Sequence, residues 1–127
     1  MFIHQLIFYP IKSAIRSGVC DDIFVSTDDK KIAEIAQQYG AEVPFIRPIE
    51  YAQDLSPDID VFMHTLLWLI ENENYTPDII VYLQITDVFR TKSMIDECVE
   101  VLMNNPEIDS AFMGLIVHKN FWRKTGD

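Results

Sequence analysis

A chain of 127 residues with 49% apolar content holds about one domain, with enough hydrophobic residues for a core and too many for disorder. Its formal net charge of −10, from 20 acidic and 10 basic residues, argues against nucleic acid as a partner, because nucleic acid requires a basic surface. The apolar runs are far shorter than the roughly 20 residues of a membrane span and no leader is evident, which predicts a cytoplasmic protein with no membrane partner.

The spacing of apolar and turn-forming residues divides the chain into alternating helical and extended segments. In chain order we predict a helix over residues 6–17, a strand over 23–25, a helix over 28–39, a strand over 41–45, a helix over 58–74, a strand over 79–83, a helix over 91–105 and a strand over 110–117. Gly18 and Gly40 are placed to end the first two helices. Short apolar strands that alternate with helices are typical of a parallel sheet covered by helices on both faces. We therefore expect a single α/β domain.

The apolar run at residues 23–25 ends in Ser26, Thr27, Asp28 and Asp29, directly before a predicted helix. Thr27 or Asp28 could cap that helix, since their side-chain oxygens can accept hydrogen bonds from its free N–H groups, and Asp29 suits the first turn. Ligands of parallel sheets, however, bind beside the carboxyl ends of the strands. The sequence leaves both interpretations open: helix capping alone, or one wall of a nucleotide pocket.

Polar side chains also follow two other predicted strands. Arg47 and Ser56 lie in the loop after residues 41–45, and Gln84 follows residues 79–83. The arginine guanidinium has a planar fork suited to phosphate, whereas serine and glutamine carry both donor and acceptor atoms that can read a base or a ribose. Each residue taken alone also fits an ordinary surface loop. The inference of a binding site therefore depends on their meeting at one edge of the sheet.

The other reactive residue types give no sign of a catalytic or metal cluster. Cys20 and Cys98 lie in different segments without a metal-ligand spacing, and we expect both to be free thiols. The histidines are scattered, and His64 within the third predicted helix is expected to be a packing or surface residue rather than a catalyst. The sequence therefore assigns neither catalytic residues nor metal ligands.

The segments "VSTDDKKIAEIAQQYGAEVPFIRPIEYAQDLSPDID" and "FMHTLLWLIENENYTPDIIVYLQIT" resemble the acylneuraminate cytidylyltransferase family, which makes CMP-sialic acid and related CMP-activated sugars. The likeness covers nearly all of the chain, and the motifs "STDD", "GAEVPFIRP" and "AQDLSP" stand in the family's order with similar spacing. The resemblance implies a Rossmann-like three-layer sandwich with a mostly parallel sheet, of the nucleotide-diphospho-sugar transferase type, lacking the first strand. Residues 1–127 would then form a single partial cytidylyltransferase domain.

The resemblance also implies a reaction and a site. The anomeric hydroxyl of a nonulosonic acid attacks the α-phosphate of CTP, and pyrophosphate leaves while Mg²⁺ shares its charge. By motif matching, Arg47 contacts the nucleotide, Ser56 and Asp58 line the cytidine site, and Gln84 meets the nucleotide or the sugar. The resemblance assigns no Mg²⁺ ligand and no further sugar contact to this chain. Sialic, legionaminic and pseudaminic acids all stay open as the sugar.

The sequence departs from the family at two places. The family's first strand and its basic, glycine-containing triphosphate loop have no counterpart in the opening residues, which read "MFIHQL". The loop from Gln84 to Arg90 reads "QITDVFR" where the family is close to Gln-Pro-Thr-Ser-Pro-Leu-Arg, and Asp87 adds a negative charge there. We therefore expect weak or absent catalysis by this chain alone. The alternative is a non-catalytic remnant that binds nucleotide or a partner chain, and a homodimer or a completing chain stays open.

Overall fold

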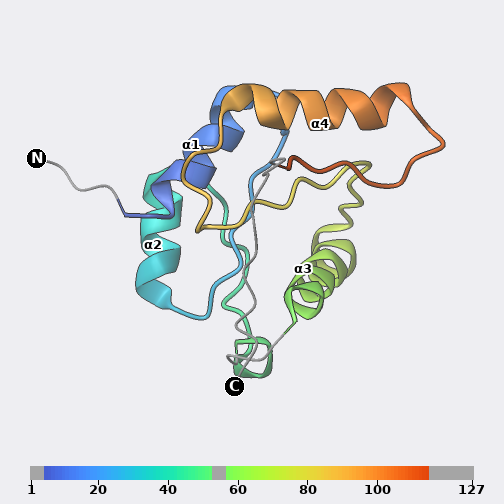
Figure 1. The fold of residues 1–127 in the computed structure, drawn as a ribbon. Coiled ribbons are helices and arrows are strands. Elements are labelled where there is room, and N and C mark those ends of the chain that lie inside the picture. The colour runs from blue at the N-terminus through green and yellow to red at the C-terminus, as the bar shows by residue number, and fades with distance from the viewer. Residues whose placement is uncertain (1–4, 53–56, 115–127) are drawn as a thin grey trace, which may run out of the picture.

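The computed structural model describes residues 5–52 and 57–114, and these fold into four α-helices and one 3₁₀ helix (Figure 1). The elements are α1 (Phe8–Ser17), α2 (Lys30–Gln38), η1 (Ile49–Tyr51), α3 (Asp58–Glu73) and α4 (Lys92–Asn104). All four helices expected from the sequence are confirmed, and each lies within two residues of its predicted bounds. The apolar spacing that predicted them is a local signal, which does not depend on distant partners.

Local capping explains where the first two helices begin and end. Gly18 follows α1 with φ of 72°, a left-handed conformation that glycine adopts without a steric penalty. Pro10 lies in the first turn of α1, where its missing N–H costs no helical hydrogen bond. At the start of α2, Oδ1 of Asp29 accepts from the N–H groups of Lys31 at 2.7 Å and of Ile32 at 3.2 Å. The expectation that Thr27 or Asp28 caps this helix is therefore wrong by one or two positions.

The predicted parallel sheet is not confirmed among the described residues. Parallel pairing there is limited to Phe24 opposite Glu42. The N–H of Val25 donates to the carbonyl oxygen of Glu42, and the N–H of Glu42 donates to that of Ile23, each at 2.8 Å. The predicted strands 23–25 and 41–45 are therefore neighbours that run in the expected parallel direction, but they form no regular ladder.

A proline explains why this pairing stops. In a parallel ladder the next donor would be the N–H of residue 44, aimed at the carbonyl oxygen of Val25, and Pro44 has no N–H. The two segments meet again beyond the break, where the N–H of Arg47 donates to the carbonyl oxygen of Thr27 at 2.8 Å. The paired segments therefore stay adjacent as far as the polar residues that follow them.

The predicted central strand over residues 79–83 also lacks a regular partner among the described residues. Its side chains nevertheless alternate in burial: Ile79, Val81 and Leu83 are half-buried, whereas Ile80 is 43% and Tyr82 is 54% exposed. This period of two is typical of an extended segment with one face against the protein. Residues 110–114 of the last predicted strand are likewise without regular pairing to the described residues, and residues 115–117 lie outside them.

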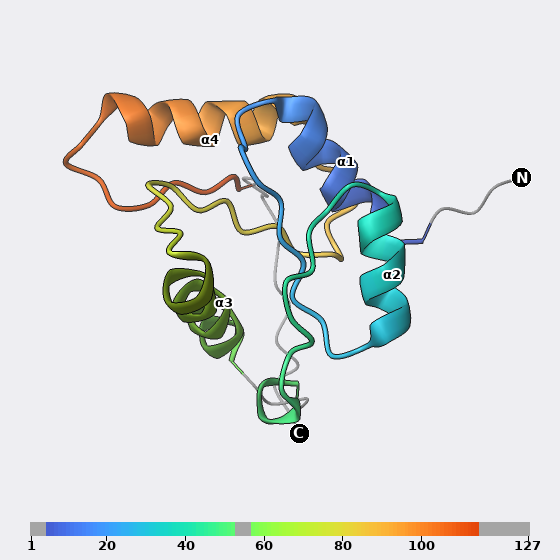
Figure 2. The same cartoon turned by 180° about the vertical axis from the view of Figure 1, so that it is seen from behind.

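The hydrophobic core lies between α1, α2 and the two paired segments. Its buried members are Ile7, Ile11, Ala36 and Ala41, and the half-buried residues packed against them are Ile23, Val25, Ile35, Tyr39 and Val43. The helix α4 contacts α1 and buries Ile95 and Val99. Figures 1 and 2 show α2 and α3 on opposite sides of the central extended segments. The two helices therefore flank these segments.

Four aromatic rings join α3 to the segment that precedes it. The ring centroid of Phe45 lies 4.9 Å from that of His64 and 5.1 Å from that of Trp68, and Tyr51 lies 4.8 Å from His64. His64 is thus enclosed by two other rings, and its Nδ1 is buried without a hydrogen-bond partner among the described residues. Of the two positions expected for His64, packed or on the surface, the structure shows the packed one.

Candidate functional site

The structure brings together the predicted site residues that it describes. The side-chain nitrogen Nε2 of Gln84 donates to Oδ2 of Asp58 at 3.3 Å. The charges of Asp58 and Arg47 both act on Tyr82, two residues before Gln84. Ser56, the remaining predicted member, lies outside the described residues. Gln84 and Asp58 are therefore in contact, and Arg47 is near enough for its charge to act on Tyr82; these four residues are called the polar cluster below.

Arg47 is held at this cluster by the end of the other paired segment. Its guanidinium Nη2 lies 3.5 Å from Oδ1 of Asp28, and its side chain is only 19% exposed. Its Nε is buried without a hydrogen-bond partner among the described residues. Thr27 adds a second contact, since its carbonyl oxygen accepts from the backbone N–H of Arg47 at 2.8 Å. The two adjacent acids after residues 23–25 thus have different partners. Asp29 caps α2, and Asp28 orients Arg47.

Asp58 reaches the cluster from the first turn of α3. A carboxylate is favourable there, because the free N–H groups of a helix start carry partial positive charge. Partial burial, followed by the charge and hydrogen bonding of Asp58, raises the pKa of the Tyr82 hydroxyl, while Arg47 and a hydrogen bond with Gln84 lower it. These opposing effects show that Tyr82 lies among the three predicted residues.

Sequence reasoning missed Tyr82, although a signal was present. Gln84 follows an extended segment, and in such a segment residues two apart share one face. Tyr82 and Gln84 are both exposed while Leu83 between them is half-buried, in agreement with that rule. The position of Gln84 therefore also indicated Tyr82.

In the loop that follows Gln84, Asp87 is paired with an arginine of the same loop. The N–H of Asp87 donates to the carbonyl oxygen of Gln84 at 3.3 Å, which closes a turn. Nη2 of Arg90 then lies 3.0 Å from Oδ2 of Asp87. Arg90 therefore offsets the negative charge that Asp87 adds to this loop. Arg90 is itself fixed by α1, since the hydroxyl of Ser13 donates to its carbonyl oxygen at 3.5 Å.

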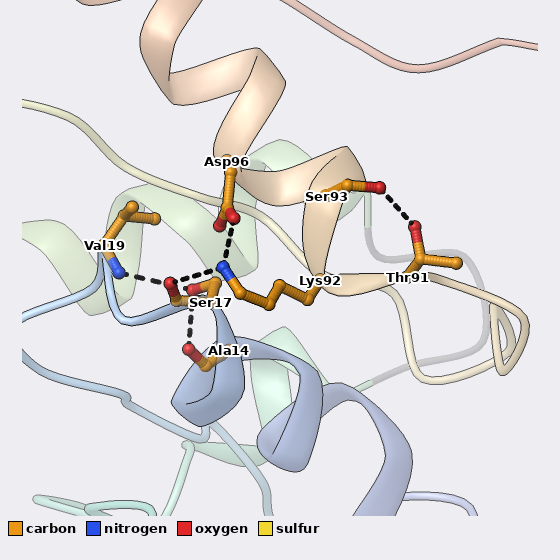
Figure 3. Close-up of polar contacts among 7 residues, drawn as sticks. All are labelled: Ala14, Ser17, Val19, Thr91, Lys92, Ser93 and Asp96. Atoms are coloured by element: carbon orange, nitrogen blue, oxygen red, sulfur yellow. Dashed lines mark hydrogen bonds and ion pairs between the residues drawn. The ribbon is translucent and has the colours of Figure 1, made fainter.

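The far end of this loop is fixed where α4 begins (Figure 3). Nζ of Lys92 donates to the backbone carbonyl oxygen of Ser17 at 3.4 Å and pairs with Asp96 one turn along α4. A cation at the carboxyl end of a helix is favourable, because the last carbonyl groups carry partial negative charge. The hydroxyl of Ser17 donates to the Ala14 carbonyl oxygen at 2.7 Å and accepts from the N–H of Val19 at 3.4 Å. The loop is thus held by α3 at Gln84 and by α1 at its other end.

A cavity of about 210 Å³ lies away from this cluster. Its lining residues are Asp22, Phe24, Glu42, Pro44, Leu69, Glu73 and Tyr75. Glu73 ends α3 whereas Asp58 begins it, so about 24 Å of helix separates them. Three acids in the wall make the cavity unsuited to a nucleotide, because like charges repel.

Within residues 5–52 and 57–114, no three His, Cys, Asp or Glu side chains converge as metal ligands would. In the same part of the chain, no helix combines the length and the apolar character that crossing a membrane demands.

Comparison with known proteins assigns the class. A family model described as Cytidylyltransferase matches residues 2–121, so the chain belongs to the cytidylyltransferase family. The chain is 38% identical over 99 residues to a CMP-N,N'-diacetyllegionaminic acid synthase of Legionella pneumophila, a match that covers 76% of the chain and 41% of that protein. It is 29% identical over 100 residues to a pseudaminic acid cytidylyltransferase of Campylobacter jejuni, covering 79% and 43%. It is 30% identical over 96 residues to an N-acylneuraminate cytidylyltransferase of Escherichia coli, covering 76% and 22%. The chain therefore spans less than half the length of these relatives.

Proposed function

We propose that this chain supplies the nucleotide site of an enzyme that transfers a cytidylyl group from CTP to a nonulosonic acid. The anomeric oxygen of the sugar forms a bond to the α-phosphorus, and the bond from that phosphorus to the bridging oxygen breaks. Pyrophosphate leaves with that electron pair, and the hydroxyl proton passes to water. Family membership supports this reaction, and the relatives' names span legionaminic, pseudaminic and neuraminic acids. We therefore propose the sugar class rather than one sugar.

The contact between Gln84 and Asp58, with Arg47 close by, is the observation that carries the proposal. Arg47 is a largely buried cation with an unpaired nitrogen among the described residues, which suits an oxygen of the triphosphate. Gln84 offers amide atoms that can recognise a base or a sugar. Ser56 belongs to the proposed site through its place in the sequence, just before Asp58.

Magnesium is part of this proposal, but the described residues do not fit a protein-held ion. Asp28 and Asp87 are each paired with an arginine, and Asp58 accepts from Gln84. Mg²⁺ commonly binds through substrate phosphates with few protein ligands. We therefore propose that Mg²⁺ arrives with CTP.

The wider architecture is also proposed. The alternating burial of residues 79–83 and the parallel contact of Phe24 with Glu42 support a Rossmann-like sheet in the working protein. A second copy or another chain would then complete that sheet by pairing with residues 79–83. We propose the cytoplasm as its location, where CTP is available.

The test measures CTP binding and pyrophosphate release separately. Calorimetric titration with CTP and Mg²⁺ should show saturable binding that Arg47→Ala weakens. Pyrophosphate release should then appear on addition of a sialic, legionaminic or pseudaminic acid. Binding without release would favour the alternative, a non-catalytic nucleotide-binding chain. Absence of binding would refute the proposed site.

A further inference from the structure

The side-chain amide of Gln84 has a partner that accepts hydrogen bonds but does not donate them. Its nitrogen Nε2 donates to Oδ2 of Asp58 at 3.3 Å, in the first turn of α3. An ionised carboxylate is an acceptor only, so the nitrogen end of the amide must face it. Since oxygen and nitrogen lie at opposite corners of the planar amide, the carbonyl oxygen Oε1 turns away from Asp58.

Tyr82 supports the same orientation. Partial burial and Asp58 raise the pKa of its hydroxyl, whereas Arg47 and a hydrogen bond with Gln84 lower it. A hydrogen bond lowers the pKa of a phenol when it is donated to the oxygen, because it stabilises the charged form. This effect agrees with the orientation that the contact with Asp58 sets, in which Oε1 of Gln84 is left for another partner.

We propose that Asp58 is a positioning residue that sets the orientation of the Gln84 amide, so that Gln84 presents its acceptor Oε1 to a ligand. The ligand group that meets Oε1 is then an N–H or hydroxyl donor, such as the cytosine amino group or a sugar hydroxyl. A phosphate or carboxylate oxygen would be repelled. The identity of the ligand rests on the proposed function, whereas the orientation of the amide does not.

The negative charge of Asp58 is compatible with a role in positioning Gln84 but not with direct contact to the triphosphate. A carboxylate placed against CTP would repel the triphosphate. Through Gln84, however, the same carboxylate selects which end of an amide the ligand meets. Specificity of this kind is strong, because a ligand without the matching donor leaves the site's polar atom unpaired.

The orientation is tested without any ligand, by hydrogen exchange in the ¹⁵N-labelled chain. We expect the side-chain amide protons of Gln84, identified by their loss in Gln84→Asn, to exchange several-fold more slowly than those of the exposed Gln37 and Gln38. Asp58→Ala removes the acceptor and should bring Gln84 to the exposed rate. Asp60→Ala removes another acid from the same first turn and should leave Gln84 slow. Equal exchange of Gln84 in wild type and Asp58→Ala overturns the proposal.

Ligand selectivity then separates the two donor sources. If Oε1 accepts from the cytosine amino group, Asp58→Ala should lower the preference for CTP over UTP about tenfold relative to Asp60→Ala, the effect of one hydrogen bond. If it accepts from the sugar, the same variant should weaken N-acetylneuraminic acid about tenfold and leave the CTP to UTP ratio unchanged. Unchanged selectivity in both arms overturns the ligand assignment. A wild-type chain that binds none of these compounds refutes the proposed function, while amide exchange still decides the orientation.

Discussion

The guanidinium of Arg47 lies 3.5 Å from the carboxylate of Asp28, and this pair joins the ends of the two segments that meet in parallel at Phe24 and Glu42. Asp28 is half exposed, so water and salt screen the pair and its contribution to stability is below about 1 kcal/mol. The pair therefore matters for where the arginine points rather than for holding the fold together.

Asp28→Asn should strengthen CTP binding several-fold, because it removes a negative charge that competes with phosphate for Arg47. Arg47→Ala should weaken binding by about tenfold or more, since a charge-assisted hydrogen bond contributes roughly 1.5–3 kcal/mol. Calorimetric titration at fixed ionic strength measures both effects. Asp21→Asn is the matched control, because Asp21 lies beside Asp22 at the distant cavity. Equal gains from Asp28→Asn and Asp21→Asn would contradict a specific role for the pair.

Ser17→Ala should lower the free energy of unfolding by about 1 kcal/mol. The Ser17 side chain is buried, and its hydroxyl bonds the Ala14 carbonyl and the Val19 N–H at the end of α1. Urea denaturation followed by circular dichroism measures the change. Ser93→Ala removes an exposed hydroxyl that contacts Thr91, and it should cost less than about 0.5 kcal/mol. Similar losses in the two variants would argue against the Ser17 contacts.

Cys20 should be alkylated slowly at neutral pH. Burial raises the pKa of its thiol above the ordinary value of 9.0, nearby Asp21 and Asp96 add to the rise, and Ser17 opposes it. Only the thiolate reacts, so iodoacetamide labelling, followed by mass spectrometry, should rise at higher pH in the folded chain than in the urea-unfolded chain. A raised pKa also means that this thiol's contribution to stability is complete below pH 9.0 and is lost as the pH rises through its folded pKa. Coincident labelling curves would contradict the burial of Cys20.

Phe45→Ala should destabilise the chain by about 2 kcal/mol, because the ring packs on His64 and Trp68 between α3 and the preceding segment. The value is below that of a fully buried ring, since Phe45 is only half-buried. Urea denaturation gives the change in stability, and Trp68 fluorescence should shift to the red as its surroundings open. Phe89→Ala is the control, because Phe89 is 88% exposed. An equal loss from both variants would mean that ring burial does not explain the effect.

The helices were predictable from the sequence because their signals are local. Apolar spacing placed α1 to α4, and Gly18 marked the end of α1 by its left-handed conformation. The cap of α2 was harder, since adjacent residues of one chemical type compete for it and Asp29 rather than Asp28 takes the position. Which of two adjacent aspartates becomes the N-cap depends on the backbone geometry at the start of the helix, and the residue types alone do not determine it.

Strands depend on partners that lie elsewhere in the chain, and here the sequence was less informative. The apolar runs indicated extended segments at residues 23–25 and 41–45, but not that these two pair with each other, and Pro44 explains why their pairing is interrupted. For the site, strand-end reasoning selected Arg47 and Gln84, which lie with Asp58 in one cluster. It could not find the pairing of Asp28 with Arg47, because that contact depends on side-chain conformation.

The two tethers that α1 provides have a consequence for how the chain can evolve. Ser13 and Ser17 are one helical turn apart, about 6 Å along the axis. The Ser13 hydroxyl donates to the carbonyl oxygen of Arg90, and the carbonyl oxygen of Ser17 accepts from Nζ of Lys92. Asp58 holds Gln84 at the other end of the loop. Because both ends of the segment from Gln84 to Arg90 are fixed, its length is constrained. An insertion there would have to dislodge either the helix attachments or the amide, so substitutions should be tolerated in this loop where additions and deletions are not.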